Sequence, residues 1–79
     1  MKVVQYGCGK MSVYTMRYVK EKGGEIVGAL DINPEVIGKD IGEIMGTENL
    51  GVSITAFEDV EKMLTETKPD VCIIETMSL

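Results

Sequence analysis

The sequence has 79 residues, which is enough for one small domain with a limited core. Its formal net charge of −5 argues against a nucleic-acid surface, because such surfaces need clustered Lys and Arg. We find neither a secretory leader nor a segment apolar enough to span a membrane, so we expect a cytoplasmic protein without nucleic-acid or membrane partners. The two cysteines should then be free thiols.

The first predicted elements are a strand and a helix. Residues 2–6, KVVQY, form a short apolar run of strand-forming residues that stops at a glycine. Residues 10–22 contain neither Gly nor Pro and end at a Gly-Gly pair, which is a helix stop signal. One face of this helix carries Met11, Tyr14 and Tyr18, joined more loosely by Thr15 and Val19. Val13 and Met16 lie off that face, so we expect them to be partly exposed or to contact another domain or subunit.

A second strand is predicted at residues 25–31, EIVGALD, which is apolar on both faces as in covered parallel sheets. Asn33 and Pro34 then suit the N-cap and first position of a helix. The apolar residues of 35–45 have helical spacing, but Gly38 and Gly42 weaken this helix, so it is expected to be short or broken.

The remaining pattern completes an alternation of strands and helices. A brief strand is predicted at 52–55, a capping box at 55–58 begins the next helix, and Lys68-Pro69 ends it. Residues 70–76, DVCIIET, form a fourth strand. The order β-α-β-α-β-α-β predicts an α/β fold, a Rossmann-like parallel sheet with strand order 3-2-1-4 and helices on both faces.

The stretch QYGCGKMS lies between the first strand and the first helix, where such sheets bind ligands. Gly7 can make the tight turn, Gly9 can let the backbone approach a pyrophosphate, and Ser12 occupies the place of a third, close-packing glycine. Asp31 closes the second strand 19 residues after Ser12, where an acid accepts hydrogen bonds from an adenosine ribose. The alternatives are a purely structural glycine turn and an aspartate that only opens the turn to Pro34.

At this point the sequence resembles a known family. The stretches VVQYGCGKMS, EIVGALDINPEVIGKDIGEIMG and KPDVCIIETM are similar to the amino-terminal half of the dihydrodipicolinate reductase-like oxidoreductases, particularly the 2,4-diaminopentanoate and amine dehydrogenases. The resemblance implies that the loop holds the pyrophosphate, that Asp31 holds the adenosine ribose and that Thr76 approaches the nicotinamide. The loop residues concerned are Gly7, Cys8, Gly9, Lys10, Met11 and Ser12.

The same resemblance implies a division of labour within a longer protein. Residues 1–79 would form the dinucleotide-binding half, whereas a later domain would carry the catalytic residues and the small amine or imine substrate. The cofactor is expected to be NAD, with NADP as the alternative, because Asp31 would repel a 2′-phosphate and Ile32 and Asn33 supply no cation. The last strand, whose core at residues 71–74 carries no charge, is expected at an exposed edge, where it would pair with a second copy or a missing segment.

Two other functions remain open at this stage. YGCGKM followed by ALDINPEVI also resembles the S-adenosylmethionine-dependent methyltransferases, although Gln5 replaces the usual acid before that loop and Met11 replaces a glycine. A non-enzymatic nucleotide-binding module is the third reading. Cys8 is interpreted as a small loop residue, because no histidine is present to activate it and Cys72 should lie too far away for a disulfide. No metal site is predicted.

Overall fold

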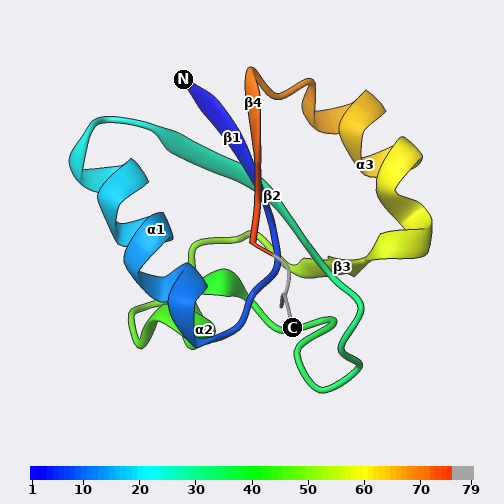
Figure 1. Cartoon of the computed structure of the whole chain (residues 1–79), viewed down its shortest axis with the longest axis horizontal. Helices are drawn as coiled ribbons and strands as arrows, with labels where there is room; N and C mark the ends of the chain where they lie inside the picture. The colour runs from blue at the N-terminus through cyan, green and yellow to red at the C-terminus, as the bar shows by residue number, and fades with distance from the viewer. Residues whose placement is uncertain (76–79) are drawn as a thin grey trace.

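The structure is a computed structural model and describes residues 1–75. Its centre is a parallel sheet with the order β3-β2-β1-β4, as predicted (Figure 1). The strands are β1 (Lys2–Tyr6), β2 (Glu25–Asp31), β3 (Ile54–Ala56) and β4 (Val71–Ile74). The first two strands have the predicted bounds. The third begins and ends slightly later than predicted, and Thr76, in the predicted fourth strand, lies outside the described residues.

Helices cover both faces of the sheet. α1 (Lys10–Glu21) and α2 (Ile41–Met45) lie on one face, and η1 (Phe57–Asp59) with α3 (Val60–Thr67) lies on the other (Figure 1). Each face has its own apolar core, as a sheet covered on both sides requires. The core under α1 and α2 is the larger and consists of Cys8, Met16, Ile26, Ala29, Ile41, Met45 and Ile54, whereas Val4, Leu30 and Met63 form the core under α3.

The buried face of α1 differs from the predicted one. Met11, Tyr14 and Tyr18 are 68%, 67% and 61% exposed, whereas Ser12 and Met16 are buried. The prediction that Met16 would be partly exposed was therefore wrong. The physical reason is that the short connection from β1 fixes the rotation of the helix about its axis, and only a small residue fits where the helix begins beside the sheet.

Two predicted helix starts were also wrong. Asn33 and Pro34 begin a series of turns rather than a helix, and the Asn33 side chain accepts the Glu35 amide within that turn. The helix starts later, at Ile41, where the Asp40 side chain caps it by accepting the Gly42 amide. The turns after Asn33 do not continue as a helix because Gly38 has φ +90° and its amide donates to the Ile54 carbonyl at 2.8 Å instead of to an earlier carbonyl of the same segment.

The capping box predicted at 55–58 is not formed. Thr55 belongs to β3, and within residues 1–75 neither η1 nor α3 receives a side-chain cap. The backbone instead turns into η1 at Ala56, so that a 3₁₀ turn leads into the α-helix, as is common at helix starts. None of the helices in this part of the chain is long and apolar enough to cross a membrane.

Strand register brings the carboxyl ends of all four strands to one edge of the sheet. Tyr6 lies opposite both Leu30 and Ile74, and Asp31 lies opposite Ala56. Because the strands are parallel, the residues that follow each of them emerge at the same edge. The glycine loop, the end of β2 and the start of the segment after β4 therefore meet there.

Candidate functional site: a pocket at the carboxyl edge of the sheet

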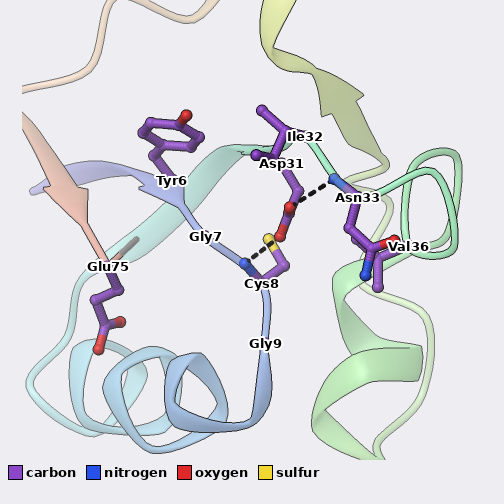
Figure 2. Close-up of a pocket in the computed structure, with 9 residues that line it drawn as sticks. All are labelled: Tyr6, Gly7, Cys8, Gly9, Asp31, Ile32, Asn33, Val36 and Glu75. Atoms are coloured by element: carbon purple, nitrogen blue, oxygen red, sulfur yellow. Dashed lines mark hydrogen bonds between the residues drawn. The ribbon is translucent and has the colours of Figure 1, made fainter. Parts of the chain in front are cut away.

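A pocket of about 450 Å³ opens at this edge, at the point where the strand order reverses. Its walls come from the end of β1 and the glycine loop, from the end of β2 with the turn after it, and from the residue after β4 (Figure 2). The lining residues are Tyr6, Gly7, Cys8, Gly9, Asp31, Ile32, Asn33, Val36 and Glu75.

Gly7 is required by the fold. Its φ of +102° lies in a region that residues with a side chain rarely adopt, and a Cβ there would collide with the backbone carbonyl of Glu75. The Gly7 amide donates to the Leu30 carbonyl at 2.9 Å. The tight turn that the sequence assigned to Gly7 is therefore present, and this glycine brings β1, β2 and the end of β4 together.

Gly9 is not required by the fold. It is the N-cap of α1 with φ −82° and ψ −166°, an extended conformation that other residues adopt, and a Cβ there would meet no atom within 4 Å. Gly9 nevertheless lines the pocket. Space at this point is thus kept free by the absence of a side chain, as expected where a ligand approaches the backbone closely.

Asp31 lies beside the glycine loop, and its carboxylate is held by two backbone amides. Its Oδ2 accepts the Cys8 amide at 2.7 Å and its Oδ1 accepts the Asn33 amide at 2.8 Å (Figure 2). Each carboxylate oxygen can accept more than one hydrogen bond, so capacity remains for a donor in the pocket. The bond to the turn residue Asn33 also shows that the proposed turn-opening role of Asp31 is real.

Cys8 serves the loop through its backbone and its small buried side chain. The thiol is 1% exposed and lies 3.6 Å from the Leu30 carbonyl. Burial, with the negative charge of Asp31 as a smaller contribution, raises the pKa of Cys8 to about 12. The thiol is therefore protonated and unreactive near neutral pH, which excludes it as a nucleophile. Cys8 and Cys72 are both free, as predicted.

Of the other three loop residues, two are exposed and one is buried. Lys10 and Met11 are exposed, and they occupy the first turn of α1, where backbone amides lack intrahelical partners. Ser12 is 1% exposed and its hydroxyl donates to the Gly9 carbonyl at 2.6 Å. Ser12 thus packs close to the sheet, as the third position of the loop requires, and its side chain does not reach the pocket.

Two polar residues next to the end of β4, Glu75 and Gln5 of β1, were not predicted from the sequence. Glu75 lines the pocket directly after β4, and the Nε2 of Gln5 donates both to Glu75 Oε1 at 2.7 Å and to the Gly7 carbonyl at 3.0 Å. Gln5 is fully buried, and its Oε1 has no partner within the described residues. A polar residue inside an otherwise apolar strand was the signal that could have drawn attention to Gln5.

Comparisons with known proteins identify the family of this chain. The family described as dihydrodipicolinate reductase, N-terminus, matches residues 1–76. The 4-hydroxy-tetrahydrodipicolinate reductase of Methanothermobacter thermautotrophicus is 34% identical over 73 residues, which cover 90% of this chain but only 27% of the relative. The chain therefore spans about a quarter of that protein.

Among solved structures, the amine dehydrogenase from Mycobacterium smegmatis superposes with a TM-score of 0.84 at 33% identity, over 94% of this chain and 22% of the dehydrogenase. A Rex-family repressor, RSP, solved in complex with β-NADH, gives a TM-score of 0.75 at 23% identity and covers 98% of this chain and 34% of RSP. The likeness to RSP, at 23% identity, shows a shared fold alone. Because the family match extends over nearly the whole sequence, the chain belongs to the dihydrodipicolinate reductase family, whose amino-terminal domain it represents.

Proposed function

We propose that this chain is the cofactor-binding half of an oxidoreductase and that its pocket binds a nicotinamide dinucleotide. The observation that carries the proposal is the open space at Gly9, a glycine that neither backbone conformation nor packing requires. It lies at the amino terminus of α1, where the helix dipole and free amides favour a phosphate group. A dinucleotide explains why this position has no side chain.

The two polar walls of the pocket fit the two ends of such a ligand. The pyrophosphate would lie against Gly9 and the first amides of α1, and the adenosine ribose would donate to Asp31 at the end of β2. The nicotinamide would then lie toward Glu75, on the β4 side of the loop. Thr76, which the resemblance assigns to the nicotinamide, lies outside the described residues.

The charge of this wall favours NAD over NADP. A 2′-phosphate would stand beside the Asp31 carboxylate, and the neighbouring pocket residues Ile32 and Asn33 carry no positive charge. Repulsion between two such charges near a protein surface is worth about 1 kcal/mol or more, which corresponds to at least about fivefold in affinity. Asp31→Ser should therefore narrow or reverse the preference.

The chemistry would be hydride transfer between the nicotinamide and an amine or imine substrate. The likeness to an amine dehydrogenase and to reductases of the same family supports this substrate class. Residues 1–79 would supply binding and orientation of the cofactor, whereas the substrate site and the catalytic residues would lie in a later domain. This division predicts that the 79-residue chain alone binds the cofactor without turning over an amine.

Calorimetric titration tests the proposal. The chain should bind NADH, bind NADPH more weakly, and lose NADH binding in the Gly9→Val variant. Asp70→Asn is a matched control, because Asp70 is exposed and lies at the opposite edge of the sheet. Binding of S-adenosylmethionine in place of NADH would instead support a methyltransferase, and unchanged NADH affinity in Gly9→Val would show that the loop is only a turn.

A further inference from the structure

The Asp31 carboxylate joins two segments that are far apart in sequence. Its bond to the Cys8 amide spans 23 residues and is short, at 2.7 Å, as hydrogen bonds to charged acceptors are. Its other oxygen is held by the Asn33 amide, which fixes the orientation of the carboxylate (Figure 2). Asp31 therefore presents a fixed anchor to the glycine loop before any ligand binds.

The shape of the loop depends on a small set of hydrogen bonds to neighbouring residues. It consists of residues 7–9, two of which are glycines, so its backbone is intrinsically free to adopt many conformations. The loop is held by Gln5 at the Gly7 carbonyl, by the Leu30 carbonyl at the Gly7 amide, and by Asp31 at the Cys8 amide. The hydroxyl of Ser12 holds the Gly9 carbonyl. Asp31 is the side chain that holds the amide immediately before Gly9, where the phosphate would approach.

We propose that Asp31 is a positioning residue for the phosphate-binding loop, in addition to its role toward the ribose. By accepting the Cys8 amide, its carboxylate sets the direction of the backbone that enters Gly9 and the first turn of α1. The loop amides are then oriented toward the pocket in advance, which lowers the cost of binding. This inference rests on the proposed function for the identity of the ligand, but the anchoring of the loop is a property of the ligand-free chain.

The proposal and simple electrostatics predict opposite changes in pyrophosphate affinity when the Asp31 carboxylate is removed. Inorganic pyrophosphate has no ribose, so it cannot be held by Asp31 directly. If Asp31 acted only through its charge, its removal would take away a repulsion and pyrophosphate would bind more tightly. If Asp31 positions the loop, Asp31→Ser and Asp31→Asn should both weaken pyrophosphate binding, because the released loop must be ordered again when the anion binds.

The first measurement is hydrogen exchange at the Cys8 amide of the ligand-free chain, followed by NMR. Loss of a hydrogen bond to a charged acceptor should accelerate this exchange about tenfold or more in Asp31→Ser. Asp31→Asn keeps the size of the side chain but replaces one carboxylate oxygen with an NH2 group, which only donates. It can therefore no longer hold the Cys8 and Asn33 amides on two separate oxygens, as the carboxylate does. Asp70→Asn removes a carboxylate that accepts the Lys2 amide, and it should leave the Cys8 amide unchanged.

The second measurement is the affinity for inorganic pyrophosphate, followed by ³¹P NMR in the wild-type chain and the same three variants. Faster Cys8 exchange together with a several-fold weaker pyrophosphate affinity in both Asp31 variants supports the proposal. Unchanged Cys8 protection, or tighter pyrophosphate binding, overturns it. If the wild-type chain binds neither pyrophosphate nor NADH, the proposed function fails, and the exchange result alone decides whether Asp31 fixes the loop.

Discussion

Substitutions at the two loop glycines should separate the needs of the fold from the needs of a ligand. At Gly9 an added methyl group meets no atom within 4 Å and φ is −82°, so Gly9→Ala should not strain the folded chain. Alanine is a poorer N-cap than glycine, which costs about 0.5–1 kcal/mol, but it restricts the unfolded chain, which returns about 0.4–1 kcal/mol. The net change in the free energy of unfolding should therefore be close to zero.

At Gly7 the same substitution should be severe. The backbone has φ +102° and the new Cβ would collide with the Glu75 carbonyl, so Gly7→Ala should cost several kcal/mol or prevent folding. For a domain of this size each 1 kcal/mol shifts Tm by about 4–8 °C. Thermal unfolding followed by circular dichroism should thus show almost no shift for Gly9→Ala and a large decrease for Gly7→Ala.

Gly9 should matter for ligand binding although it does not matter for folding. Side chains forced into a filled space cost about 1–3 kcal/mol, so Gly9→Ala should weaken NADH binding about 5- to 150-fold, and the branched Gly9→Val should abolish it. Calorimetric titration measures this on variants whose Tm has already been compared. A Gly9→Ala variant with wild-type affinity would refute the argument that this position is kept open for a dinucleotide.

Three further predictions concern the rest of the chain. The exposed Cys72 should react with iodoacetamide at pH 8, whereas the buried Cys8 should not, and mass spectrometry of the labelled peptides would check this. Because the pKa of Cys8 is raised from 9.0 to about 12, the free energy of unfolding should also fall as the pH rises above 9. The backbone amides that Asp40 accepts, foremost that of Leu50, hold the pKa of this carboxyl below its usual value. Its contribution to stability should therefore be complete above about pH 4 and lost as the pH falls through the lowered pKa, so that denaturant midpoints below pH 4 decrease less in Asp40→Asn than in wild type. β4 is an edge of the described sheet and its Ile74 is 65% exposed, so the chain should self-associate in light scattering and Ile74→Lys should reduce this; a monodisperse wild-type monomer would contradict the prediction.

The strands and their order could be predicted from the sequence because each strand carries its own signal. The run EIVGALD is apolar on both faces, which is characteristic of strands covered on both sides, and the run KVVQY is rich in strand-forming residues. Glycines mark where each run begins or ends. The alternation with helices then allows few arrangements, since crossovers between parallel strands are right-handed. Local patterns were sufficient here because they agree with the global fold.

The orientation of α1 could not be predicted in the same way. Its larger apolar residues, Met11, Tyr14 and Tyr18, suggested one face, yet the structure buries Ser12 and Met16. Hydrophobic periodicity shows that a helix forms, but which face is buried depends on how the preceding loop directs the helix against the sheet. Similarly, the pattern after β2 could not show that Asp40, which accepts the amides of Gly42, Leu50, Gly51 and Val52, provides the cap.

The candidate site shows the same division between local and long-range information. The sequence by itself determined that the glycine loop and Asp31 lie at the same edge of the sheet, because each follows or closes a predicted strand and parallel strands place their carboxyl ends together. Only the tertiary structure decided that Gly7 is required for contact with the residue after β4, that Gly9 stands in open space, and that the Asp31 carboxylate holds the Cys8 amide. These contacts join segments that are 23 or more residues apart, and no local pattern specifies them, since they arise when parallel strands place their carboxyl ends at one edge.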